Sequence, residues 1–110
     1  MERFVKGEVV ILPFPYTDLS TIKKRPALIV ATLKGENIIL AQITTKHRDD
    51  EDALTLKKTD FISGVLKMDS LIMPSILFTV ESSTVNYKAG KIKPEKIKEV
   101  EKKLVDIFTR

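Results

Sequence analysis

The chain has 110 residues, of which 43% are hydrophobic and 31% are charged, and its formal net charge at neutral pH is +4. This length predicts one domain, residues 1–110, without room for a second module, and the composition excludes a disordered chain. The sequence contains no cysteine, which excludes disulfides, thiolate metal sites and a cysteine nucleophile.

The excess of positive charge lies near the C-terminus. Residues 1–87 hold eleven basic and eleven acidic residues, whereas residues 88–110 hold eight and four. Most of the second group is expected on the exposed face of a helix, so net charge by itself is weak support for nucleic-acid binding. The N-terminus lacks the apolar core of a signal peptide and no apolar run could cross a bilayer, which predicts a cytoplasmic protein without membrane contact.

The first half of the chain predicts three strands. Residues 8–14 are almost wholly apolar and rich in β-branched side chains, Pro26 opens a strand at 27–31, and a turn at 33–37 precedes a third strand at 38–44. These runs are nearly continuous rather than alternating, so both faces should be covered, as in a small closed barrel with another element packed outside it. The short connections exclude βαβ crossovers.

The middle of the chain has a weaker pattern. Residues 53–56 suggest a short edge strand, and 57–64 are interpreted as a connection. Two further short strands are expected at 70–73 and 77–80, because Pro74 interrupts the apolar run between them.

The C-terminal segment predicts an amphipathic helix of about fourteen residues. Pro94 suits the first helical turn, and Glu95 complements the positive end of the helix dipole. The expected apolar face is formed by Ile97, Val100, Leu104, Ile107 and Phe108. The residues expected away from it are Lys96, Lys98, Glu99, Lys102 and Lys103. Such a helix should lie across the barrel or against a second copy of the chain.

A basic cluster stands where a polar loop meets the second strand. Lys23 and Lys24 lead to Arg25, which is followed at once by Pro26 and an apolar run. A guanidinium with a fixed base and an open front suits a phosphate held by two parallel hydrogen bonds. For an arbitrary small protein, solvated loop charges are the simpler interpretation.

Several stretches around this cluster resemble those of one toxin family. The specific block comprises residues 7–10, 14–20 and 24–30. Weaker similarities follow at 41–44, at 66–67, 70–72 and 78–80, and at 90–92 with Val100 and Leu104 of the helix. Together they closely resemble the MazF/PemK toxins, sequence-selective endoribonucleases of type II toxin–antitoxin pairs. The resemblance covers nearly the whole chain. One departure is a loop before Arg25 that contains no glycine, which bears on substrate choice.

The resemblance implies a fold, a reaction and partners. The fold would be mainly β, an SH3-like barrel of the MazF/PemK/CcdB type with a C-terminal helix, and the protein would form a homodimer. It would cut single-stranded mRNA without a metal or other cofactor, leaving a 2′,3′-cyclic phosphate and a 5′-hydroxyl, and a cognate antitoxin with a flexible acidic segment would silence it. The catalytic residues would be Arg25 and Thr44, with Arg25 also implied in proton transfer, although a guanidinium rarely gives up its proton.

Further residues are candidates for RNA contact. They are Lys23, Lys24, Tyr16, Thr17, Thr45, Lys46, His47 and Arg48. Tyr16 could stack on an unpaired base. His47, the only histidine, is either a general base or, more simply, an exposed loop residue. The acids at 49–52 lack the spacing and glycine of a calcium loop, so they are expected to be solvated.

Two other functions remain open at this point. A barrel of this type can bind nucleic acid without cleaving it, since fold alone does not determine function. A toxin on the same scaffold could instead poison a protein target such as DNA gyrase. Lys24, Arg25 and Thr44 favour the ribonuclease.

Overall fold

The computed structural model describes residues 3–14, 23–46 and 49–110. The elements are β1 (Glu8–Phe14), β2 (Lys23–Thr32), β3 (Asn37–Thr44), β4 (Leu54–Leu56), β5 (Phe61–Gly64), β6 (Ser70–Glu81), β7 (Tyr87–Ile92) and α1 (Pro94–Thr109), with short 3-10 helices at Lys58–Asp60 and Ser82–Thr84. The strands form one antiparallel sheet in the order β4-β6-β3-β2-β1-β7-β5.

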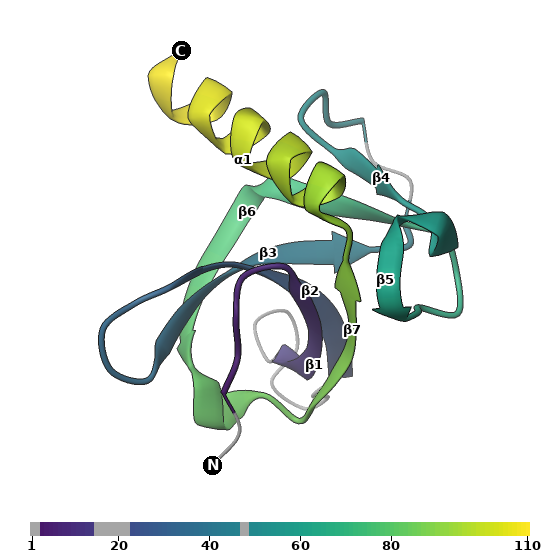
Figure 1. Ribbon diagram of the computed structural model, residues 1–110. Coiled ribbons are helices and arrows are strands. Elements are labelled where there is room, and N and C mark those ends of the chain that lie inside the picture. The colour runs from purple at the N-terminus through teal and green to yellow at the C-terminus, as the bar shows by residue number, and fades with distance from the viewer. Residues whose placement is uncertain (1–2, 15–22, 47–48) are drawn as a thin grey trace.

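The sheet curls into a half-barrel, and α1 runs across its outside (Figure 1). The predicted class, mainly β with a C-terminal helix, is confirmed. The expectation of a closed barrel is wrong, because the short strands β4 and β5 stand at the two edges of the sheet. Within the described ranges, no helix combines the length and the apolar content needed to cross a bilayer.

Both faces of the central strands are buried, as their continuous apolar runs predict. On β1, Val9 belongs to a core cluster with Leu28 of β2 and Val100 of α1. Val10 and Leu12 of the same strand belong to a second cluster, which also contains Phe14, Ala27, Ile29, Ile38 and Leu40. Burial of each large side chain contributes about 1.5–3 kcal/mol, so β1, β2 and β3 form the stable centre of the fold.

Strand β6 corrects the expectation of two short strands. It is continuous over twelve residues and absorbs Pro74 in an irregularity, because β3 pairs Ala41 with Leu77 and the next residue, Gln42, with Met73. A bulge leaves residues outside the ladder, and a proline there forfeits no sheet hydrogen bond.

Strands β5 and β7 were not predicted, and the interpretation of 57–64 as a connection is wrong for its second half. Both strands are short and carry glycine at their point of contact, where Gly64 pairs with Gly90. A Cβ on Gly64 would lie 2.1 Å from the carbonyl oxygen of Ala89. The absence of a side chain therefore allows the close approach of the two strands. Glycine is unfavourable in strands, which is why the sequence did not predict them.

The helix has sixteen residues, more than predicted, and two of its side chains lie on a different face from the one expected. Val100 is buried, and Ile97 and Leu104 pack against the first core cluster as expected. Phe108, expected on that face, is 71% exposed. Lys96, expected in solvent, is only 9% exposed, because its ammonium lies 2.7 Å from Glu99 and 3.8 Å from Asp60 in the 3-10 turn before β5.

We predict that Gly64→Ala destabilises the fold more than Gly35→Ala does. Both glycines have positive φ angles, 67° and 78°, but a Cβ at Gly35 meets nothing within 4 Å. The two variants should therefore differ in free energy of unfolding by the cost of the steric clash at Gly64, about 1–3 kcal/mol. Urea unfolding of both variants measures this difference. Equal losses would show that the contact between β5 and β7 is not tight.

Candidate functional site

The start of β2 and the end of β3 lie side by side at one end of the sheet. These two strands are antiparallel neighbours, with Ala27 opposite Gln42 and Leu28 opposite Ala41. The basic cluster opens β2, and Thr44 closes β3. The pairing therefore brings together two segments that the sequence separates by about twenty residues.

The register would set Arg25 opposite Thr44 if it continued two residues beyond the last pair, that of Ala27 with Gln42. Directly opposed residues of antiparallel strands point to the same face, with Cβ atoms about 4.5–5.5 Å apart. On its other side Arg25 is paired with Leu12 of β1, which is buried in the second core cluster. Arg25 is itself half-buried, and its pairing with β1 fixes the position of its backbone.

Thr44 is the more enclosed of the two candidate catalytic residues. It is 5% exposed, and its Oγ1 accepts a hydrogen bond of 3.1 Å from the backbone N–H of Lys46. That bond uses a lone pair of the hydroxyl and not its proton, so the O–H can still donate. A hydroxyl oriented in this way suits a hydrogen bond to a phosphate oxygen.

The basic candidates lie at the same end of the sheet. Lys23 and Lys24 are exposed and face Phe14 and Pro13 of β1 in the register. Thr45 and Lys46 directly follow β3 and are exposed too. The other candidates lie outside the described residues; they are Tyr16, Thr17, His47 and Arg48.

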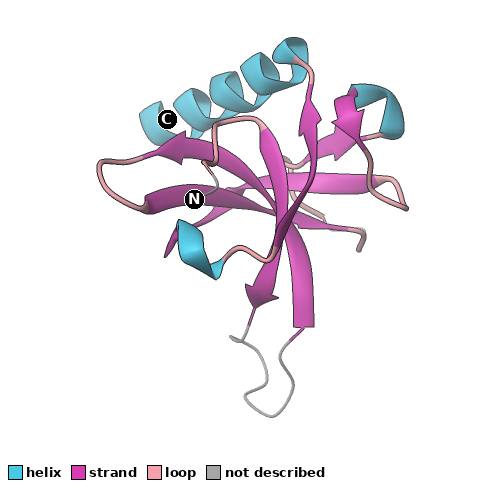
Figure 2. Cartoon of the chain, turned by 60° about the horizontal axis from the view of Figure 1, so that its bottom comes forward, coloured by secondary structure: helices cyan, strands magenta, loops and turns pink. Residues whose placement is uncertain are grey.

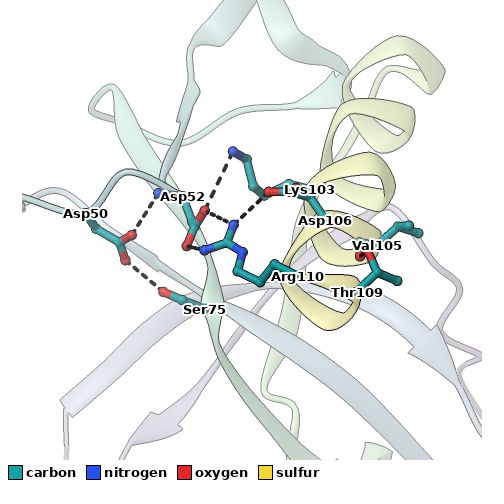
Figure 3. A network of polar contacts seen from close by, with 8 residues as sticks. All are labelled: Asp50, Asp52, Ser75, Lys103, Val105, Asp106, Thr109 and Arg110. Atoms are coloured by element: carbon teal, nitrogen blue, oxygen red, sulfur yellow. Dashed lines mark hydrogen bonds and ion pairs between the residues drawn. The ribbon is translucent and has the colours of Figure 1, made fainter.

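The acidic segment at 49–52 is not simply solvated, as the sequence led us to expect, because two of its acids make side-chain contacts with other elements. Asp52 has a side chain only 15% exposed and pairs with Arg110 at the end of α1, with Lys103 nearby (Figure 3). The Arg110 guanidinium donates to this carboxylate and holds the pKa of Asp52 below its ordinary value. Arg110 also pairs with Asp106, and its hydrogen bonds to Asp52 and Asp106 raise the pKa of the guanidinium. Among the described residues, no group of three or more His, Cys, Asp or Glu is placed to hold a metal ion.

A mainly apolar groove lies next to the candidate catalytic residues and was not predicted from the sequence. It encloses about 450 Å³, and its lining includes Pro26 and Thr45, the residues after Arg25 and Thr44. Its walls expose three large side chains, those of Val65, Met68 and Tyr87. Val65 and Met68 follow β5, whereas Tyr87 opens β7, so the groove forms only because these two strands pair, and no local pattern could have revealed it.

Comparison with known proteins matches nearly the whole chain to one family. The family described as PemK-like, MazF-like toxin of type II toxin–antitoxin system matches residues 5–108. Comparison with curated protein sequences finds no match.

Several solved structures share the fold. A MazF from Deinococcus radiodurans is 15% identical with a TM-score of 0.77, over 100% of both chains. An endoribonuclease from a Mycobacterial species, solved with its cognate antitoxin, is 14% identical with a TM-score of 0.76 and covers 96% of this chain and 95% of its own. The Mycobacterium tuberculosis toxin MazF-mt6 is 17% identical with a TM-score of 0.71, covering 92% of this chain and 95% of its own.

We predict that Arg110→Gln raises the pKa of Asp52 toward its ordinary value of 3.8. A carboxylate whose folded pKa is lowered contributes stability above its unfolded pKa and loses it as pH falls through the folded one. The Asp52–Arg110 ion pair should therefore lose its contribution to stability only in acid, as pH falls below the ordinary pKa of Asp52. Carboxyl-carbon NMR titration checks this, and identical Asp52 curves in both proteins would show that Arg110 does not hold the carboxylate in solution.

Proposed function

The chain belongs to the PemK-like, MazF-like toxin family of type II toxin–antitoxin systems, and on that premise we propose that it is an endoribonuclease toxin. Its substrate is single-stranded mRNA, cut selectively at a short sequence. The attacking group is the RNA's own 2′-hydroxyl, and the products are a 2′,3′-cyclic phosphate and a 5′-hydroxyl. Solved structures that share this fold are described as an endoribonuclease and as MazF toxins, which supports the proposal.

The observation that carries the proposal is the antiparallel register of β2 with β3. It directs an arginine and a threonine from distant parts of the sequence to one end of the sheet, beside exposed lysines. Attack by a 2′-hydroxyl demands three things from a protein: the phosphate must be held in line, and the charge that develops on its oxygens must be stabilised. The third is proton transfer, since the 2′-hydroxyl loses its proton as the new P–O bond forms and the leaving 5′-oxygen gains one as the old P–O bond breaks. The family resemblance implies Arg25 in this transfer.

Each of the two residues has a distinct role in this mechanism. The guanidinium of Arg25 binds two oxygens of the scissile phosphate and stabilises the extra negative charge of the phosphorane. The Thr44 hydroxyl donates one hydrogen bond to a phosphate oxygen, while the Lys46 N–H bonded to its Oγ1 fixes its direction. Lys23, Lys24 and Lys46 attract the RNA backbone through charge.

The proposed partners are a second copy of the chain and a cognate antitoxin. Exposed apolar side chains such as Tyr87, Val105 and Phe108 offer surface for pairing of two copies. The antitoxin would place a flexible acidic segment over the same lysines that bind RNA, and both associations would weaken as salt rises. Solved MazE–MazF complexes from Deinococcus radiodurans share this fold, which supports such a partner. We place this system in the cytoplasm, where mRNA is available.

We predict that Arg25→Ala abolishes cleavage of a long single-stranded RNA while the protein stays folded. Arg25→Lys should fail as well, because a point charge cannot reproduce two parallel hydrogen bonds to a phosphate. Denaturing gel electrophoresis measures cleavage, and circular dichroism checks the fold. Cleavage near the unaltered rate by either variant would remove Arg25 from the site.

We predict that Thr44→Val slows cleavage about tenfold to a thousandfold, the scale of one hydrogen bond made in the transition state. Thr44→Ser is the matched control, because it keeps the hydroxyl and should retain most of the rate. Single-turnover kinetics with saturating protein measures both. Equal rates for the valine and serine variants would show that the hydroxyl takes no part.

A further inference from the structure

The mainly apolar groove is joined to the candidate catalytic residues by one row of paired residues. Tyr87 of β7 is opposite Ile11 of β1, Ile11 is opposite Pro26 of β2, and all three line the groove. Neighbouring strands lie about 4.7–4.9 Å apart, which sets the Cα atoms of Tyr87 and Pro26 about 10 Å from each other. Since Pro26 is bonded directly to Arg25, Tyr87 lies close to the place where Arg25 would bind a phosphate.

The groove and the phosphate site lie on two sides of the start of β2. Side chains alternate along a strand, so Arg25 points to the face of Leu12, whereas Pro26 points to the groove. Among the described residues, the pairs of β2 with β3 begin at Ala27, and β3 ends at Thr44. The start of β2 therefore has an edge that β3 does not cover, and a single strand of RNA can cross this edge from Arg25 into the groove.

The lining of the groove combines an aromatic ring with positive charge. Tyr87 is 55% exposed, and Met68 beside it is exposed too. The described lining residues include two lysines and no acid. Lys88 is paired with Glu8, whereas Lys67 is exposed and gives the wall its charge. An aromatic face with a cation nearby suits an unpaired base, whereas a symmetric contact between two copies through this groove would bring like charges together.

One wall of the groove is anchored to the sheet. The Oγ of Ser70, a buried residue, donates a hydrogen bond of 2.9 Å to the backbone carbonyl of Met68. Ser70 is itself paired with Leu56 of β4. The groove encloses about 450 Å³, within the range of about 300–1,000 Å³ that is typical of sites for small ligands. Its size and its fixed wall therefore suit a flat ring.

We propose that this groove is a nucleobase subsite, in which Tyr87 stacks on a base of the RNA strand close to the scissile phosphate. The inference deepens the proposed function and rests on it. Every base has a π-face, so the stack selects an unpaired strand rather than a particular base. Of the exposed side chains that could pair two copies, Tyr87 is thereby assigned to RNA, whereas Val105 and Phe108 lie on α1.

Removal of the ring tests the stack. Tyr87→Leu keeps an apolar side chain and should weaken RNA binding about fivefold to a hundredfold, the scale of one base–aromatic stack. Tyr87→Phe keeps the ring and should bind nearly as well as the unaltered protein. The probe is a fluorescein-labelled single-stranded RNA that contains the mapped cut sequence. A 2′-deoxynucleotide at the cut removes the nucleophile, so the probe stays intact while fluorescence anisotropy measures its affinity.

Salt dependence separates stacking from charge. Each phosphate contact contributes about 0.7 to the slope of log affinity against log salt for a single strand. Tyr87→Leu should leave this slope unchanged, whereas Lys24→Ala should lower it by about 0.7. Leu33→Ala is the control, because Leu33 is an exposed apolar residue that follows the other end of β2. It should change neither the affinity nor the slope.

An abasic RNA identifies the base that stacks. An abasic ribonucleotide is placed in turn at each position around the cut. At the position that occupies the groove, loss of the base should weaken binding to the unaltered protein as much as Tyr87→Leu does. The same loss should not weaken binding to the Tyr87→Leu variant further, because both changes remove the same contact. Light scattering should give the same mass for the variant and the unaltered protein.

The possible failures can be told apart. RNA affinity unchanged by Tyr87→Leu, or losses that add at every abasic position, would overturn the subsite while the proposed function stood. A lower mass for the Tyr87→Leu variant would also overturn it, by showing that the groove pairs two copies of the chain. Failure of the unaltered protein to cleave RNA would overturn the proposed function and the subsite with it.

Discussion

The antiparallel pairing of β2 with β3 is the constraint on which the rest of the structure depends. Its register is fixed by apolar residues on both faces, with Leu28 in one core cluster and Ala27, Ile29 and Leu40 in the other. A slip by one residue would exchange the two faces and move these side chains out of the core clusters that they now fill. The core therefore decides which residues meet at the polar end of the strands, and the candidate site follows from it.

Much of the fold could be predicted because its centre is made of apolar strands. Residues 8–14 and 38–44 predict β1 and β3 closely, since a continuous β-branched run between turn residues has few other solutions. The helix follows from its period. What failed was decided by contacts between distant segments: Gly64 with Gly90 in β5 and β7, the bulge that accommodates Pro74, and the ion pairs that bury Lys96.

The candidate site was predictable in its residues and not in its supports. Arg25 and Thr44 stand where a polar segment meets a strand, and the family resemblance selects them from other charged and hydroxyl residues. The ion pair of Asp52 with Arg110 could not be predicted, because the two residues are 58 positions apart in the sequence. An acidic run at 49–52 and a basic excess at 88–110 were both visible, but complementary charge alone does not identify which residues pair.

The most direct measurement is to incubate the purified protein with a long single-stranded RNA and a metal chelator and to map the new ends. We expect cuts at one short shared sequence, with 5′-hydroxyl and 2′,3′-cyclic phosphate ends, because the pair of Arg25 and Thr44 needs only the RNA's own 2′-hydroxyl as nucleophile. Intact RNA, or new ends that carry a 5′-phosphate, would contradict the assignment of this site.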